Sequence, residues 1–150
     1  MTPTETWDDL RALEGTTFTG EWFTVDADRL EQFDHATYTD ENPDLPGGTD
    51  YPDGLVEGFH LLALLDHLVT KALVATGRTV YGWNYGFDKV RFTSPVLAGQ
   101  PIRVQGRISE VAPRADGCLA LLDVQIEVEG REKPACIAAW RILWMRGEEA

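Results

Sequence analysis

The sequence feature that most constrains the fold is one long apolar segment, from about Gly58 to Val74. Apolar side chains would cover nearly every side of a helix formed by this segment, and such a helix is normally buried in a protein core. The segment is too short and too polar for a membrane span. It therefore predicts a domain whose core is organised around a single helix.

The segments that follow this helix change to a period of two, which is typical of half-buried strands. The first, Val80–Phe92, is interrupted by glycines, and three later segments alternate apolar with polar residues. These three segments are residues 102–108, 118–128 and 136–144. Because short connections join them, we expect an antiparallel meander.

The segments that precede the helix predict two short elements and a polar loop. Thr16–Val25 is rich in strand-forming residues, and Asp28 to about Thr37 predicts a short helix that Asp26 caps. A loop dense in turn residues, Tyr38–Asp50, follows. One buried helix with a run of strands predicts a single α+β domain over residues 1–150, in which the sheet wraps around the helix.

Composition argues against several classes of function. Acidic residues outnumber basic ones by 25 to 13, and a net charge of −12 argues against nucleic acid as a partner. Cys118 and Cys136 have the spacing of neither a metal site nor a disulfide framework, so we expect both in a reduced core. The N-terminal residues lack the basic and apolar regions of a signal peptide. We therefore expect a cytoplasmic protein with no membrane partner and no metal.

The polar side chains of the apolar helix share one stripe, which predicts a site at its start. His60, His67 and Lys71 lie almost above one another, with Glu57 just before the helix. Gly58 lets a ligand approach the first backbone amides closely. Glu57 and His60 can act as base and orienter; alternatively, His60 is a hydrogen-bonded core histidine. We expect His67 to be structural or at the exposed end of the helix.

Two stretches resemble a known family. Residues 84–104, Asn-Tyr-Gly-Phe-Asp-Lys-Val-Arg-Phe-Thr-Ser-Pro-Val-Leu-Ala-Gly-Gln-Pro-Ile-Arg-Val, and residues 127–140 are similar to the second half of MaoC-like proteins, above all the NodN-like branch. The match extends from about Phe33 to Trp144. It implies a hot-dog fold, in which a curved antiparallel sheet wraps one central helix, usually in a dimer. It also implies hydration of enoyl thioesters or dehydration of 3-hydroxyacyl thioesters carried on coenzyme A or an acyl carrier protein, without cofactor or metal.

The family's catalytic loop, Asp-x-Asn-Pro-x-His, is only partly present. Asp40, Asn42 and Pro43 match the pattern, whereas Leu45 occupies the histidine position. In the family the Asp and His shuttle a proton through water, while an amide at the helix start holds the thioester oxygen. Asp40 is therefore either the retained catalytic carboxylate or a residue that only forms an Asx turn.

A second departure lies at the helix start, where Glu57 stands in place of the histidine of the family's His-Gly pair. We expect Glu57 and His60 to replace the missing loop histidine. His35 either binds substrate or caps the end of its helix, and Asn84 and Tyr85 either bind substrate or form pocket wall. The predicted catalytic residues are Asp40, Glu57 and His60; the predicted substrate-binding residues are His35, Asn42, Gly58, Asn84 and Tyr85.

Three functions agree with these residues. The first is a hydro-lyase acting on an acyl thioester or a related metabolite. The second is a thioesterase-like hydrolase, and the third is a catalytically lapsed subunit that binds acyl thioesters or completes a partner's dimer. Fold alone cannot choose among them. Since long alternating strands leave an unpaired edge, we expect a homodimer or a dimer with a paralogue, formed by sheet edges and central helices.

Overall fold

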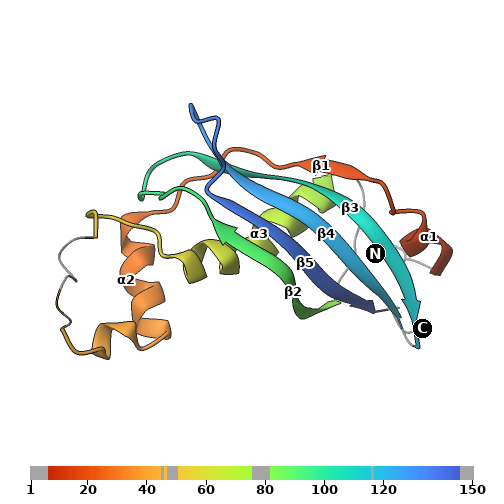
Figure 1. The fold of residues 1–150 in the computed structure, drawn as a ribbon, viewed down its shortest axis with the longest axis horizontal. Coiled ribbons are helices and arrows are strands. Elements are labelled where there is room, and N and C mark those ends of the chain that lie inside the picture. Colours follow the sequence, from red (N-terminus) through yellow and green to blue (C-terminus); the bar gives the residue numbers. More distant parts are fainter. Residues whose placement is uncertain (1–6, 45, 47–50, 76–81, 116, 146–150) are drawn as a thin grey trace.

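The computed structural model describes residues 7–44, 46, 51–75, 82–115 and 117–145, and the following description concerns these residues. These residues form four helical elements and five strands, and the last four strands follow the longest helix without interruption (Figure 1). In order they are α1 (Trp7–Arg11), β1 (Thr17–Thr19), α2 (Ala27–Ala36), η1 (Thr39–Glu41), α3 (Gly58–Ala75), β2 (Gly82–Phe92), β3 (Ile102–Arg114), β4 (Gly117–Val128) and β5 (Cys136–Met145).

The strands form one antiparallel sheet in the order β1-β3-β4-β5-β2. Its curved face covers α3, which crosses behind the sheet in Figure 1. The predicted meander is confirmed, since β3, β4 and β5 are neighbours in chain order. The predicted α+β class, with a sheet around one central helix, is confirmed as well.

Alternation of side chains explains which face of the sheet is buried. Along β5, every second residue from Cys136 to Trp144 is buried, and β4 and β3 show a similar period in their central parts. On β3, Gly106 is half-buried and pairs with Phe18 of β1, and an added Cβ would lie 2.5 Å from the Phe18 ring. Glycine at this position therefore lets Phe18 close the edge of the core.

Helix α3 is buried on one side only. Its buried residues are His60, Leu61, Leu65, Leu68, Val69, Ala72 and Leu73. Phe59 is 78% exposed and Val74 is 53% exposed. The expectation of burial on all sides is thus wrong for a single chain, because the sheet covers only one face of the helix.

The membrane argument from the sequence also needs correction. By length and composition alone, α3 is apolar enough to cross a membrane. Its packing identifies it as the core helix of this domain, since its buried residues join the same hydrophobic core as the sheet.

The N-terminal elements differ in extent from the prediction. The strand expected over Thr16–Val25 is reduced to β1, with Phe23 forming one isolated bridge to Ile102. Asp26 occupies the N-cap of α2, but its side chain makes no capping hydrogen bond. Helix α2 lies beyond the end of the sheet, beside the start of α3 (Figure 1). This placement brings a polar helix against the first turn of the core helix.

Candidate active site

A pocket of about 620 Å³ opens at the N-terminal end of α3. Helix α2 and η1 form one wall, the start of α3 forms another, and the segment from Tyr51 to Leu55 borders it. Its lining residues are Leu30, Asp34, Thr39, Tyr51, Pro52, Gly54, Leu55, Glu57, Gly58, Phe59 and His60. The predicted residues Glu57, Gly58 and His60 are therefore together in one pocket.

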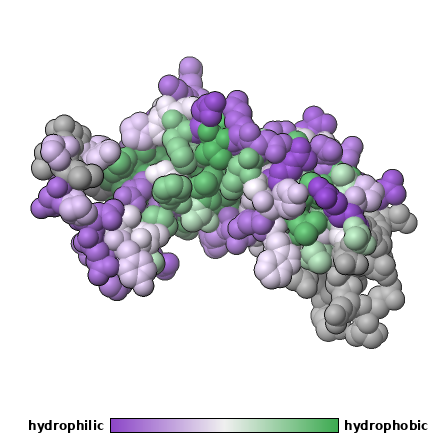
Figure 2. Space-filling model, turned by 60° about the horizontal axis from the view of Figure 1, so that its bottom comes forward, coloured by the Kyte–Doolittle hydropathy of each residue, from purple (hydrophilic) through white to green (hydrophobic). Residues whose placement is uncertain are grey.

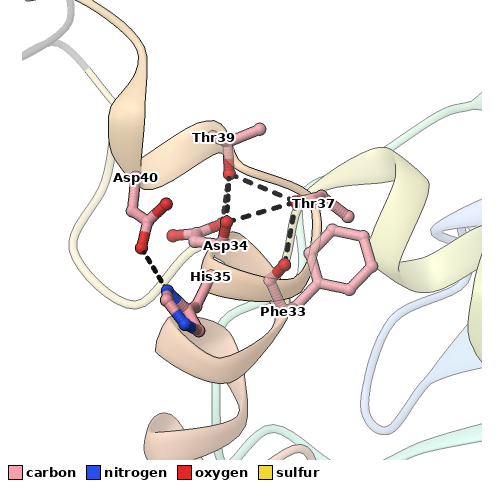
Figure 3. A network of polar contacts seen from close by, with 6 residues as sticks. All are labelled: Phe33, Asp34, His35, Thr37, Thr39 and Asp40. Carbon is pink, nitrogen blue, oxygen red and sulfur yellow. Dashed lines mark hydrogen bonds and ion pairs between the residues drawn. The ribbon is translucent and has the colours of Figure 1, made fainter.

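Two carboxyl groups meet in this pocket, Glu57 from the residue before α3 and Asp34 from α2. Burial raises the pKa of Glu57, and the negative charge of Asp34 and a hydrogen bond between the two side chains raise it further. The Thr39 hydroxyl lies 3.2 Å from Oδ1 of Asp34 and donates to it (Figure 3). Thr39 therefore holds Asp34 at the pocket that it lines together with Glu57.

His60 is the buried polar side chain of the pocket, with 8% of its surface exposed. Its ring stacks on Phe33 of α2, with 4.4 Å between ring centroids and 7° between planes. Burial lowers the pKa of His60, and the charge of Asp34 partly opposes this. Among the described residues, no side chain or backbone group hydrogen-bonds to the ring. His60 is therefore a neutral imidazole whose nitrogens are available to a ligand.

The first turn of α3 supplies backbone donors at the pocket. Amides at a helix start lack partners within the helix, and the first that bonds back is that of Leu61, to the Glu57 carbonyl at 3.0 Å. An added Cβ at Gly58 would lie 3.0 Å from the Phe92 ring of β2. Glycine thus lets Phe92 pack closely at a position that also lines the pocket.

Asp40 and His35 are brought together, but away from the lining of this pocket. His35 Nδ1 lies 2.9 Å from Oδ2 of Asp40, and the two side chains are 87% and 39% exposed (Figure 3). Asn42 follows η1, and its amide donates to the Thr39 carbonyl. Leu45 lies outside the described residues. The roles predicted for Asp40, His35 and Asn42 remain predictions.

Asn84 and Tyr85 lie on the exposed strand β2, apart from the pocket at the helix start. Asn84 borders a second cavity of about 700 Å³ between α3, β2 and β5, which His67 also lines. The guanidinium of Arg114 lies over the Tyr85 ring, with its Cζ 5.7 Å from the ring centroid. Their predicted binding roles therefore also remain predictions.

Sequence reasoning missed Asp34 and Thr39. One signal for Asp34 was present: it follows Leu30 by one helical turn, on the apolar side of the predicted helix. Both residues line the pocket. No comparable signal marked Thr39, which stands in a loop rich in polar residues.

Two named relatives match most of the chain in sequence. Nodulation protein N of Rhizobium meliloti (strain 1021) is 32% identical over 141 residues, which cover 88% of this chain and 86% of the relative. 3-Hydroxyacyl-thioester dehydratase Z of Mycobacterium tuberculosis is 30% identical over 123 residues, covering 79% of this chain and 81% of the relative. A scan of protein-family models finds no match.

Solved structures share the fold at low sequence identity. A MaoC-like dehydratase from Rhodospirillum rubrum superimposes with a TM-score of 0.65 at 15% identity, covering 91% of this chain and 94% of that chain. The 3R-hydroxyacyl-ACP dehydratase complex HadBC from Mycobacterium tuberculosis gives 0.65 at 16% identity, covering 87% and 96%. The fluoroacetyl-CoA-specific thioesterase FlK gives 0.64 at 13% identity, covering 89% and 87%.

Fold and pocket thus define a hot-dog protein with acidic and imidazole groups at the start of its central helix. On the sequence matches, the chain belongs to the MaoC-like family, with nodulation protein N and 3-hydroxyacyl-thioester dehydratase Z as relatives.

Proposed function

We propose that the protein is a hydro-lyase that interconverts 3-hydroxyacyl thioesters and enoyl thioesters. The observation that carries this proposal is the pocket at the start of α3, which Glu57, Gly58 and His60 line together. Membership in a family with a 3-hydroxyacyl-thioester dehydratase supports the same substrate class.

Dehydration needs three groups, and the pocket offers each. The Gly58 amide is suited to hold the thioester oxygen, which becomes negative when the proton on C2 leaves. Neutral His60 is suited to accept that proton, because burial lowers its pKa. Glu57 is suited to donate a proton to the hydroxyl on C3, which leaves as water, because a raised pKa favours its protonated form. The electron pair of the C2–H bond forms the double bond, and hydration is the reverse.

Retention of strained polar groups favours an enzyme over a lapsed subunit. Placing Glu57 in a half-buried position near Asp34 disfavours its ionised form and so lowers stability when it ionises. An acyl-binding subunit without chemistry would gain stability from apolar residues at these positions. A thioesterase shares the fold, but it needs water directed at the thioester carbonyl instead of proton transfer at C2 and C3.

The substrate test measures both reactions on the same samples. Purified protein is incubated with short- and medium-chain trans-2-enoyl-CoA, and loss of the conjugated enoyl thioester is followed by ultraviolet absorbance. Release of free coenzyme A is followed with a thiol reagent. We expect the wild type to consume the enoyl thioester without releasing thiol. Glu57→Gln should no longer consume it. Thiol release alone would identify a thioesterase, and neither signal on coenzyme A or carrier-protein substrates would contradict the hydro-lyase.

We also propose that the active form is a dimer, either of two copies or with a paralogue. Strand β2 lies at one edge of the described sheet. Exposed aromatic residues are present both on β2 and at the start of α3. These residues are Phe59, Trp83, Tyr85, Phe87 and Phe92. An apolar area is visible where this lower edge of the molecule is turned forward (Figure 2). The HadBC complex supports a paralogous pair as one form of this assembly.

Light scattering across micromolar concentrations measures the assembly directly. We expect the mass of a dimer, because an exposed strand edge and apolar helix face are stabilised by a partner. A monomeric mass throughout this range would contradict the homodimer. We propose a cytoplasmic location, which the buried free thiols of Cys118 and Cys136 support.

A further inference from the structure

The second cavity follows the active-site pocket along helix α3. The pocket ends at Phe59 and His60, and the cavity of about 700 Å³ begins at Ala63, one turn further on the same side of the helix. Strands β2 and β5 form the rest of its wall. Its volume lies within the range that is usual for sites of small organic ligands.

The buried wall of this cavity is apolar or aromatic. Its buried residues are Val69, Leu73, Trp140, Ile142 and Trp144. Such a wall suits an alkyl chain, because burial of apolar surface favours binding.

The polar side chains at the rim of the cavity are exposed, and two of the charged or titratable ones have contacts of their own. Lys71 pairs with Glu21 at 3.5 Å. The ring of His67 packs against the ring of Phe23, with 5.8 Å between centroids. These two rim groups are therefore solvated or in contact with other residues, and they do not require a ligand.

Trp140 is different from the rim groups, because its polar atom is buried in the wall. Its side chain is 3% exposed. Its Nε1 is the fully buried side-chain polar atom that lacks a hydrogen-bond partner in the described part of the chain. A buried donor without a partner lowers stability, whereas phenylalanine would fill the same position without this cost. A donor kept beside a cavity at this cost indicates a ligand that accepts its hydrogen bond.

We propose that this cavity binds the distal part of the acyl chain, and that Trp140 selects chains with a neutral oxygen, to which Nε1 donates. This inference rests on the proposed hydro-lyase function, because the chain beyond C3 must then leave the first pocket. The preferred substrates are acyl thioesters with a ketone or hydroxyl along the chain. A carboxylate is disfavoured, because one neutral donor in an apolar wall does not offset the loss of its hydration.

The ring that covers Trp140 comes from an irregular part of an edge strand. Phe87 stacks on Trp140, with 6.1 Å between ring centroids and 11° between planes. Phe87 is 37% exposed on β2, and the register with β5 shifts on both sides of it. Bulges of this kind are frequent beside active sites. Since Nε1 is closed to solvent, we expect the bound chain to displace Phe87 and bring the N–H edge of Trp140 to its oxygen.

The first test measures binding without turnover. Isothermal titration calorimetry compares decanoyl-CoA with decanoyl-CoA that carries one ketone, moved carbon by carbon along the distal half of the chain. These saturated chains lack a C3 hydroxyl, so a hydro-lyase does not consume them. In wild type we expect one ketone position to bind about threefold to tenfold more tightly than decanoyl-CoA, the range of one neutral hydrogen bond. Equal affinity at every position would overturn the proposal, as would tighter binding of a chain that ends in a carboxylate.

Trp140→Phe keeps an aromatic ring and removes the donor. This variant should bind decanoyl-CoA about as tightly as wild type and should lose the preference for the ketone. Trp22→Phe is the matched control, because Trp22 lies under the guanidinium of Arg103, 4.4 Å from the ring centroid, and outside this cavity. It should keep the preference. A preference that persists in Trp140→Phe would refute the role of Nε1.

A measurement on wild type covers the case in which Trp140→Phe does not fold. The indole N–H of Trp140 is assigned by triple-resonance NMR and followed during titration. The ketone-bearing chain should shift this proton downfield relative to decanoyl-CoA, because the N–H gains an acceptor. The same shift with both chains would overturn the proposal.

The tests separate this inference from the proposed function. If ketone-selective binding depends on Trp140 but wild type hydrates no enoyl thioester, the hydro-lyase fails and the oxygen-selective cavity stands. If wild type hydrates enoyl thioesters but has no preference for a ketone, the hydro-lyase stands and the role of Trp140 fails. In an active enzyme, Trp140→Phe should raise KM for a ketone-bearing enoyl-CoA by the factor lost in affinity and leave kcat unchanged. A fall in kcat with every chain would instead show a structural role.

Discussion

Replacing His60 with phenylalanine separates its chemical role from its packing role. The substitution keeps an aromatic ring stacked on Phe33, where the centroids are 4.4 Å apart, and such a stack contributes about 0.5–1.5 kcal/mol. It removes two ring nitrogens that have no hydrogen-bond partner among the described residues. The fully buried side-chain polar atom without a partner in the described part of the chain is Trp140 Nε1, so the ring nitrogens of His60 keep some solvent contact and their loss should change stability little.

We therefore expect His60→Phe to have a stability close to that of wild type. A difference of about 1 kcal/mol corresponds to a shift of about 2–4 °C in Tm for a domain of this size. Turnover should fall about 10²–10⁴-fold, the usual contribution of general acid–base catalysis. Thermal unfolding and the enoyl hydration assay measure the two quantities on the same preparation.

The burial of His60 also predicts the direction in which Tm changes with pH. Since burial lowers the pKa of His60 below the usual 6.5, the folded protein binds fewer protons than the unfolded chain in the range below 6.5. Wild type consequently loses stability as pH falls through that range. The advantage of His60→Phe over wild type should grow toward acid pH.

Two control variants sharpen the result. His60→Ala removes the stack and leaves a void, so its Tm should fall by several degrees while turnover falls as in His60→Phe. His67→Phe changes an exposed histidine of the same helix and should leave turnover unchanged. Wild-type turnover in His60→Phe would refute the chemical role. A marked loss of stability in that variant would show that the ring nitrogens are structural.

Three further predictions concern the other carboxyls and their coupling. Glu57→Gln should raise Tm relative to wild type by an amount that grows as pH rises above 4.5, because a raised pKa makes wild type lose stability as Glu57 ionises. Thermal scans from acid to alkaline pH measure this difference in Tm. A difference that is independent of pH would contradict the prediction. Glu57→Gln and His60→Ala should each reduce kcat, and the double variant should lose little more than either alone; additive losses in steady-state kinetics would mean that the two groups act independently. Asp40→Asn should change Tm little, since its contact with His35 is exposed, and should reduce kcat far less than Glu57→Gln; a loss of about 10²-fold or more would instead support the loop mechanism implied by the family resemblance.

The family and most of the sheet followed from local sequence patterns. Alternation in β3, β4 and β5 depends only on which side chains face the core, and short connections leave few alternatives to a meander. The place of Glu57 and His60 at the helix start also followed from the sequence, because both lie within one turn of the start of α3. The resemblance to MaoC-like proteins is confirmed by the matched relatives.

The pairing of Asp34 with Glu57 was decided only by tertiary structure. The two residues belong to different elements separated by a polar loop, and no local pattern sets how α2 packs against the start of α3. The same contact stacks Phe33 on His60, whereas local geometry directs Asp40 to His35 instead. Sequence placed acid and base residues at the start of the helix, but the packing of α2 determines which carboxylate shares their pocket, because proximity between distant segments depends on the whole fold.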